Sequence, residues 1–273
     1  MLKNKINEII NSLMNPNNQT IKSLILPSLG FELSSSPTNI NLSKIGGLPP
    51  ILKENWPIFD GKPLLFLGQL SLSQINEFND ILPVKGILCF YLCVDGISNR
   101  YPDRKGEFKV QYLEKEEQES LNVEFSVIKE FSISFFELFT FPSYQENIIT
   151  KSDVSEEDLC LIEDIETEIQ TIMSQNYDIT HQILGHPKAI QGTVRFWWAM
   201  KYLGFDDVSV CSEHEISLIK QEEDKFILLL QLNFSDPKVE IDYFGESIAY
   251  FGIHQFDLQN ANWHNVVLVM QNT

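Results

Sequence analysis

Two glutamines are the side chains whose type and spacing most suggest a ligand-binding site in this sequence. Gln69 closes the apolar run LLFLGQL and Gln231 closes the similar run FILLLQL, so each puts an amide at the same point of an apolar strand. A buried amide must find hydrogen-bond partners, here in neighbouring turns of the chain or in a ligand. We favour the turns. If the two amides instead line a shared cleft, the predicted binding residues are Trp56, Gln69, His186, Gln231 and Tyr250.

Histidines are the second group of residues that could do chemistry. All five lie in the last hundred residues, and the candidates among them are His181, His186, His254 and His264. Imidazole is a common zinc ligand, so these side chains could form a metal site if neighbouring strands brought them together. No pair has the close spacing of a common zinc motif, and we predict loop and sheet-edge residues, with no metal and no cofactor. A metal-dependent enzyme is the open alternative.

The cysteines and serines indicate no nucleophile. The four cysteines, Cys89, Cys93, Cys160 and Cys211, are too few and too scattered for a disulfide framework. Cys89 and Cys93 share the apolar run GILCFYLCV, where a strand would point both to one face and bury them as inert hydrophobes. No Gly-x-Ser-x-Gly elbow occurs, so the catalytic residues, if there are any, stay unknown.

The stretch SKIGGLPPILKENWP, Ser43 to Pro57, has the glycines of a phosphate-binding loop. Such a loop offers several backbone N–H groups at the start of a helix. Pro49 and Pro50 remove two of those donors, and no helical pattern follows. We therefore interpret the stretch as a turn that leads into a strand, with Trp56 as a packing anchor.

The charge of the chain excludes more functions than it selects. Acidic residues outnumber basic ones by 38 to 20, which gives a formal net charge of −18. A field of this sign repels nucleic-acid phosphates and anionic membrane surfaces, so neither is expected as a partner. The partner class that it favours is a basic protein, although such a charge often serves only solubility.

The elements that must position these residues are mainly strands. Apolar runs and alternating patterns predict strands around PLLFLGQLSLS, KGILCFYLCV, EFKVQYLEK, LNVEFSVIKEFSISFFEL, DKFILLLQLNF, KVEIDYF, SIAYFGIHQF and WHNVVLVMQ. Ser71 and Gln74 predict a capping box that opens a short helix through Phe78. A helix near 155–176 begins at Ser155 and Asp158, which resemble a capping box, and carries seven acids from Glu156 to Glu168. We interpret these acids as a solvated face. The predicted fold class is α+β, mainly antiparallel sheet with flanking helices.

An internal repeat relates the two halves of the chain. A Gly-Pro turn, a strand ending in Gln-Leu and a second apolar strand occur in the same order after Gly47 and after Gly185. We predict an internal duplication, with halves at 43–150 and 177–273 of a single domain that spans 1–273, joined by the helix near 155–176.

Several segments in order resemble the YwqG-like family, a domain of unknown function. They are KIGGLPPILKENWP, GKPLLFLGQL, LPVKGILCFYL, HQILGHP, LLLQLNF and YFGESIAYFGI, and they cover roughly Ser43 to Gln271. The resemblance implies an α+β fold on antiparallel sheet with an internal duplication. It also implies a bacterial, cytosolic protein, since most family members are of this kind. Some members are regarded as immunity or partner proteins of toxin systems. It carries over no catalytic residue.

Two functions from different classes follow. The favoured one is a binding or interaction protein with an acidic surface, comparable to an immunity protein. The other is an enzyme or small-molecule binder that uses a cleft between the repeat halves. The N-terminus has no continuous apolar segment followed by a cleavage site, so we expect a cytoplasmic protein.

Overall fold

The computed structural model describes most of the chain. The described residues are 4–5, 8–9, 11, 18–36, 39–78, 80–94, 101–102, 104–114, 128–175, 177, 179–239, 241 and 244–272. Parts of two predicted strands, at 121–127 and within KVEIDYF, lie outside them. In the described part of the chain, no helix is both long and apolar enough to cross a membrane.

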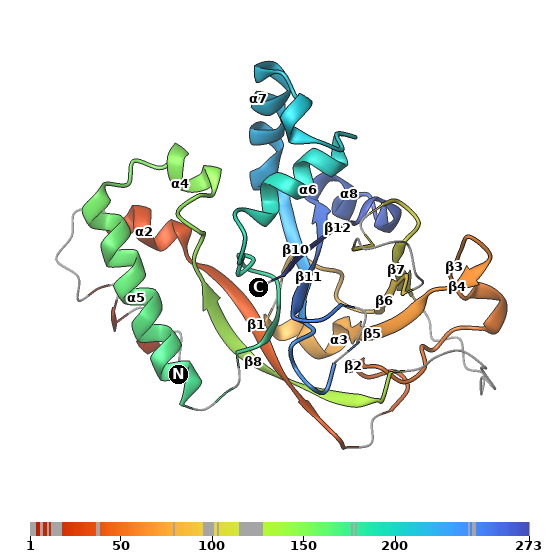
Figure 1. The fold of residues 1–273 in the computed structure, drawn as a ribbon. Helices are drawn as coiled ribbons and strands as arrows, with labels where there is room; N and C mark the ends of the chain where they lie inside the picture. The colour runs from red at the N-terminus through yellow and green to blue at the C-terminus, as the bar shows by residue number, and fades with distance from the viewer. Residues whose placement is uncertain are drawn as a thin grey trace.

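One antiparallel sheet of ten strands organises the fold (Figure 1). Its strand order is β12-β11-β10-β9-β1-β8-β2-β5-β6-β7. The strands are β1 (Leu26–Ser34), β2 (Lys44–Ile45), β5 (Leu65–Ser71), β6 (Ile87–Leu92), β7 (Phe108–Leu113), β8 (Phe131–Thr140), β9 (His181–Ile183), β10 (Phe226–Asn233), β11 (Ser247–His254) and β12 (Val267–Asn272). A separate hairpin joins β3 (Ile58–Phe59) and β4 (Lys62–Pro63). The α+β class and the antiparallel sheet are confirmed.

The sheet curves until its two ends nearly close a barrel. Phe90 of β6 and Phe251 of β11 meet edge to face with ring centroids 5.2 Å apart, and Tyr112 of β7 stacks on Trp263 at 5.3 Å. The shared core between these walls comes from both ends of the sheet, since alternate residues of each strand point inward. We call β5–β7 the first arm and β10–β12 the second arm.

Helices cover the outer faces of this sheet. On one side α2 (Asn18–Leu24) and α5 (Glu156–Ser174) pack against β8. On the other, α6 (Val194–Tyr202) and α7 (Glu213–Glu222) lie over the second arm around Trp198. Other helices among the described residues are α3 (Leu72–Ile75), α4 (Asn147–Lys151), α8 (Gln255–Gln259) and the short 3-10 turns η1 (Lys53–Asn55), η2 (Asn76–Phe78), η3 (Val208–Val210), η4 (Glu223–Lys225) and η5 (Trp263–Asn265).

The capping box predicted for the acidic helix is confirmed. The Ser155 hydroxyl accepts a hydrogen bond from the Asp158 N–H, and the Asp158 carboxylate accepts one from the Ser155 N–H, so α5 begins where two orphan donors are satisfied. The acids Glu156, Glu157, Glu163, Asp164 and Glu168 are exposed along this helix.

Two local predictions were wrong. Ser71 does precede α3, but its side chain makes no capping bond, because Gln74 Oε1 instead accepts from the N–H of Ser43. In KVEIDYF, the described residues Val239 and Phe244 lie in turns rather than in a strand. Both side chains are buried against Phe234, and this packing accounts for the apolar pattern that resembled a strand.

The stretch Ser43 to Pro57 forms the turn that was predicted, in a conformation that its glycines allow. Gly46 and Gly47 have φ values of 68° and 71°, a left-handed conformation that side chains disfavour. Their N–H groups donate to the carbonyls of Leu67 and Ile128, at 2.8 and 2.9 Å, so neither is left for a phosphate. Trp56 is 5% exposed, and its indole N–H donates to Leu64 O at 2.8 Å, as expected of a packing anchor.

Candidate functional site

The predicted binding residues fall into two separate groups. Gln231 Oε1 accepts from the Lys188 N–H at 2.9 Å, and the Tyr250 hydroxyl donates to Lys188 O at 2.8 Å. His186 lies two residues earlier, and its carbonyl accepts from Gln182 Nε2 at 2.8 Å. Gln231, Tyr250 and His186 therefore meet around the segment that follows β9.

The other two residues, Gln69 and Trp56, belong to the first arm. Gln69 Nε2 donates to the carbonyls of Ile40 and Leu42, at 2.6 and 2.8 Å, while Trp56 packs edge-on against Tyr91. The glutamines thus hold backbone segments in place at opposite ends of the sheet. A role of these five residues in binding a ligand stays a prediction.

The histidines do not converge either. His181 Nε2 lies 3.0 Å from Asp236 Oδ2, and His254 Nε2 lies 3.1 Å from Glu222 Oε2, so each has its own carboxylate. Within the described residues, no group of three or more metal-ligating side chains gathers at one point.

His186 belongs to a buried ionic group. Its Nδ1 lies 3.6 Å and Arg195 Nε lies 3.8 Å from Glu146 Oε2, and all three residues are at most 4% exposed. Burial lowers the pKa of His186, and the nearby Arg195 lowers it further, although Glu146 opposes the shift. The group ties the His186 turn to the start of α6 and to the segment before α4. None of the described pockets is lined by these three residues.

The cysteine prediction is confirmed. Cys89 and Cys93 are both buried and lie in one apolar cluster with Trp56. Burial raises the pKa of the Cys89 thiol to about 12, which keeps it protonated and inert.

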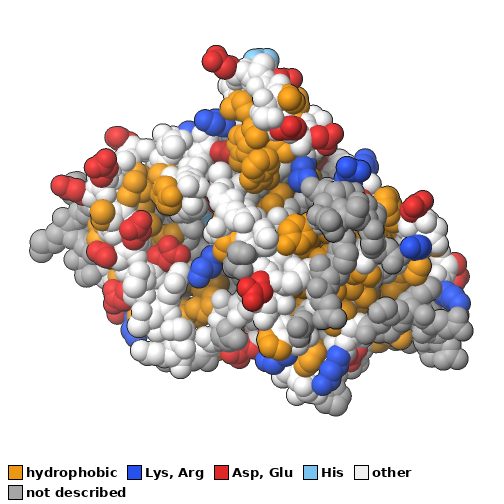
Figure 2. All heavy atoms as spheres, in the orientation of Figure 1, with side chains coloured by type: hydrophobic (Ala, Val, Ile, Leu, Met, Phe, Trp, Pro, Cys, Tyr) orange, Lys and Arg blue, Asp and Glu red, His pale blue; other side chains and the backbone are white. Residues whose placement is uncertain are grey.

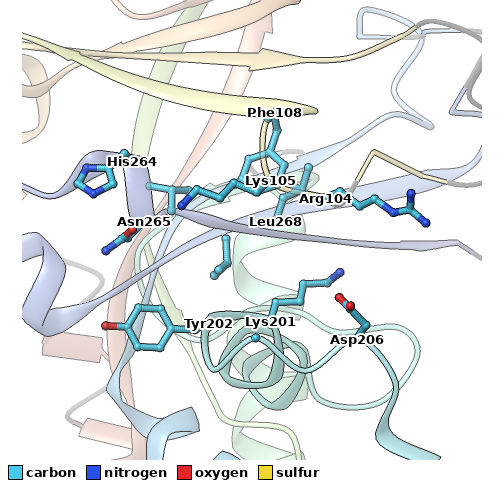
Figure 3. Close-up of a pocket in the computed structure, with 13 residues that line it drawn as sticks. Arg104, Lys105, Phe108, Lys201, Tyr202, Asp206, His264, Asn265 and Leu268 are labelled. Atoms are coloured by element: carbon cyan, nitrogen blue, oxygen red, sulfur yellow. The ribbon is translucent and has the colours of Figure 1, made fainter. Parts of the chain in front are cut away.

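The largest described pocket lies where the barrel stays open, between the two arms (Figure 3). Its volume is about 1110 Å³. The first arm contributes the loop before β7 and Phe108, while α6, η5 and β12 supply the other walls. The lining residues are Arg104, Lys105, Gly106, Phe108, Lys201, Tyr202, Gly204, Asp206, His264, Asn265, Val266, Val267 and Leu268.

Basic side chains dominate the charge of this pocket. Arg104, Lys105 and Lys201 are cations, and His264 can become one, whereas Asp206 is the one carboxylate among the described lining residues. In Figure 3, Lys105 lies beside Phe108 on one wall, and Lys201 extends from the opposite wall on the side where Asp206 lies. Because the cations lie on walls that face one space, the pocket can hold an anionic group.

Reasoning from the sequence missed most of this site. Of its polar residues only His264 was a candidate, and none of the five predicted binding residues lines the pocket. The available signal was the pair Arg104-Lys105, two adjacent cations followed by glycine in a strongly acidic chain. Nothing in the sequence alone placed that pair opposite Lys201.

An antiparallel sheet with a nearly closed barrel shape, covered by helices, defines the class of this protein as α+β with a pocket between two arms. The family follows from a match of residues 43–271 to DUF1963, described as a domain of unknown function. Since the match spans most of the chain, the protein belongs to this family, the YwqG-like family of the resemblance. A comparison with curated protein sequences gives no match.

Proposed function

We propose that this DUF1963 protein is a binding protein that holds an anionic group of its ligand in the pocket between the arms. The observation that carries the proposal is the charge of the lining: among the described lining residues there are three cations, a histidine and one carboxylate, in a chain of net charge −18. The lining gathers positive charge at one place of an anionic molecule, and these cations would attract an anion that enters the pocket.

The shape of the pocket supports a small ligand or part of a larger one. A volume of about 1110 Å³ is slightly above the usual range of about 300–1,000 Å³ for pockets that bind drug-sized ligands. Phe108 and Tyr202 provide apolar surface on two walls, and Asn265 provides an amide that can orient a polar group. The lining comes from residues 104–108 and 201–268, one set from each predicted half, and this supports the second functional hypothesis.

The test is anion binding by calorimetry and thermal unfolding, with inorganic phosphate, citrate and glutarate as probes. We expect citrate to bind, and the double variant Arg104→Ala/Lys105→Ala to weaken binding at least tenfold. The matched control removes two exposed lysines elsewhere, Lys53→Ala/Lys238→Ala, and should bind as the wild type does. Absence of binding by all three anions, or equal weakening by both double variants, would overturn the proposal.

The acidic surface supports a second candidate, a basic protein partner in the manner of an immunity protein. Figure 2 shows Asp and Glu side chains spread over the side that α5 occupies in Figure 1, and α5 itself contains no Lys, Arg or His. Replacing Glu163 and Asp164 with Gln and Asn should weaken capture of a basic partner at low salt. A capture experiment that finds no basic partner at either low or physiological salt would remove this candidate.

We also propose that the two arms are copies of one unit. Gln69 and Gln231 lie at matching places in their arms, each following an irregularity in the ladder, between Phe66 and Gly68 and between Leu228 and Leu230. Gln69 pairs with β2 and β6, and Gln231 pairs with β9 and β11. An alignment of many family members that fails to match the two arms to each other would contradict the duplication.

A further inference from the structure

A hairpin of helices projects from the second arm. In Figure 1, α6 and α7 stand above the sheet, and η3 lies in the turn that joins them. We call residues 203–218, which run from the end of α6 through η3 into α7, the α6–α7 tip, and all of them are described. The apolar side chains of the tip that pack against the buried cluster around Trp198 are Phe205, Val208 and Ile216. Those that are exposed are Leu203, Val210 and Leu218.

Val210 is exposed in a turn whose backbone is capped on both sides. It is 79% exposed, the largest fraction among the large hydrophobic side chains of the described residues. The Asp207 carboxylate accepts from the N–H of Ser209 at 2.8 Å, and Ser212 and Glu215 form the capping box of α7. These caps satisfy the backbone in this conformation, so the exposure of Val210 belongs to the folded turn. Covering its side chain with apolar atoms of a partner would be favourable.

Hydrophobic side chains gather on this projection. Figure 2 shows a group of them over the region that α7 occupies in Figure 1, with Asp and Glu side chains around the group. Single exposed apolar residues are ordinary in soluble proteins, whereas a group of them rimmed by polar residues is typical of a contact surface. The α6–α7 tip therefore has the composition of a docking surface.

The charge of the tip is negative. Residues 203–218 contain four carboxylates, one histidine and no Lys or Arg. Hydrogen bonds from Ser209 lower the pKa of Asp207, and hydrogen bonds from Ser212 lower the pKa of Glu215, so both carboxylates are ionised at neutral pH. The nearest cations along the chain lie outside the tip, at Lys201, which lines the basic pocket, and at Lys220. The tip would therefore attract the cations of a partner.

The two properties of the tip together favour one kind of occupant. A second copy of the chain would bring the same carboxylates and a net charge of −18, which opposes self-association through this surface. A helix with an apolar face and basic margins fits both properties, because its apolar side chains can cover Val210 while its lysines and arginines meet the carboxylates.

We propose that the α6–α7 tip is the docking surface for a basic amphipathic helix of a partner protein. This inference rests on the second candidate function, a basic protein partner, and it places that partner on the tip rather than on α5. Burial of the exposed apolar side chains provides affinity, and the carboxylates select for basic partners. Anion binding in the basic pocket is not required for it.

The first experiment measures the binding of a model partner to the full chain. The probe is a peptide of leucine and lysine whose leucines recur at helical spacing. The comparison peptides are its scrambled sequence and the same pattern with glutamate in place of lysine. We expect only the patterned lysine peptide to bind, and its affinity to decrease as salt is added, because the carboxylates lie at the surface. Equal binding of the scrambled or the glutamate peptide would overturn the proposal.

The second experiment tests the apolar part of the surface with matched variants. Val210→Ser should weaken binding of the lysine peptide about tenfold, because the peptide then covers a hydroxyl instead of a branched apolar side chain. The control is Val84→Ser, at a valine that is 63% exposed and lies outside the tip, and it should bind as the wild type does. Both valines are exposed, so thermal unfolding should show that both variants are folded. Equal weakening by the two variants would contradict the role of the tip.

A second pair of variants tests the charge. Asp207→Asn/Glu213→Gln should weaken binding about fivefold at low salt, and asparagine at the first position keeps an acceptor for the Ser209 N–H. The matched control removes two carboxylates from the exposed face of α5, Glu163→Gln/Asp164→Asn, and should change the affinity little.

The outcomes separate this inference from the candidate function on which it rests. If the α5 variant weakens binding and the tip variants do not, a basic partner stands and its place on the tip is wrong. If the lysine peptide does not bind even at low salt, the docking surface is wrong, whereas the candidate function fails only if the capture experiment also finds no basic partner. A dimer of the full chain in sedimentation that Val210→Ser dissociates would assign the tip to a second copy and overturn the proposal.

Discussion

The two arms of the sheet have similar strands, but different segments pack against their outer faces. In each arm one face joins the shared core, where Phe90 meets Phe251. The outer face of the first arm is covered by a short irregular segment around Trp56, whereas the outer face of the second arm lies beneath α6 and α7 around Trp198. Strand pairing can therefore repeat while the chemistry of each arm depends on what the connecting segments place over it.

The strand residue that contacts the covering tryptophan differs between the two arms. Tyr91 of β6 packs edge-on against Trp56, with ring centroids 5.9 Å apart. Gly252 of β11 leaves room for Trp198, because a Cβ at that position would lie 2.6 Å from the indole ring. The second arm thus gives up a side chain on the strand to seat a helix directly against the sheet.

The largest expected loss of stability comes from removing the tryptophan that packs α6 against the second arm. Trp198 is fully buried between α6 and the sheet, so Trp198→Ala should leave a cavity that rigid neighbours cannot fill and cost about 3–5 kcal/mol of unfolding free energy. Trp56→Ala should cost less, about 2–3 kcal/mol, because the segment over it can collapse more easily. Denaturant unfolding measures both. Equal losses would show that the helical cover makes no difference.

The next prediction concerns a charge that the first arm buries. Lys44 Nζ lies 2.8 Å from Glu130 Oε2, and the side chains are 3% and 36% exposed. Lys44 faces Gln69 across the ladder, where the second arm has Gln182 facing Gln231. Glu130→Gln should cost about 2–3 kcal/mol, because it leaves a buried ammonium without its counter-charge.

The matched variant for this pair is Lys44→Gln, which gives the first arm the residue type of the second. We expect it to cost only about 1 kcal/mol, since the carboxylate that remains is partly hydrated. Equilibrium unfolding of both variants checks the order. If Lys44→Gln is the more destabilising of the two, the prediction is wrong, because the lysine would then stabilise the fold by more than its ion pair with Glu130.

The glutamines provide a smaller contrast. Gln231→Leu removes the acceptor of the Lys188 N–H, and an orphan N–H in a buried site should cost about 1–3 kcal/mol. Gln69→Leu removes a donor from two carbonyls, which tolerate the loss better, so about 1 kcal/mol is expected. Free energies of unfolding by denaturant again decide. A larger loss for Gln69→Leu would contradict the difference in partners.

The two arms also show which parts of the fold can be predicted from the sequence. The strands of both arms and α5 were predicted because apolar runs and a capping box are local patterns. The glutamines were correctly interpreted as ties to neighbouring turns, since a buried amide must be satisfied. That Gln69 holds a segment before β2 while Gln231 holds one after β9 depends on loop paths, which no local pattern encodes.

The pocket was beyond local patterns for the same reason. Arg104 and Lys201 are separated by nearly a hundred residues and meet only because the sheet curves until β7 approaches β12. The helix α7 was missed as well, although Ser212 and Glu215 form a capping box before it. Its weakly apolar face gave the pattern of a polar loop.

The smallest expected effect is a pH dependence of stability that comes from a buried carboxyl beside the second arm. Glu223, just before β10, is buried, and this desolvation together with the nearby Asp224 raises the pKa of its carboxyl to about 7. The unfolded chain releases that proton near pH 4.5. Between these values the folded state binds more protons, so the contribution of Glu223 to stability decreases as the pH rises from 4.5 to 7.

Glu223→Gln removes this loss, so the stability of the variant relative to the wild type should increase with pH across that window and then level off. Lys151 nearby is half exposed, and solvent screening limits the expected change to on the order of 1 kcal/mol. Unfolding at pH 5, 6, 7 and 8 measures it, with Glu157→Gln on the exposed face of α5 as the control. His186 acts in the opposite sense, because its lowered pKa makes its contribution decrease as the pH falls below 6.5, and subtracting the wild-type curve cancels it. A difference between Glu223→Gln and the wild type that stays flat from pH 5 to 8 would show that the second arm does not bury a protonated carboxyl.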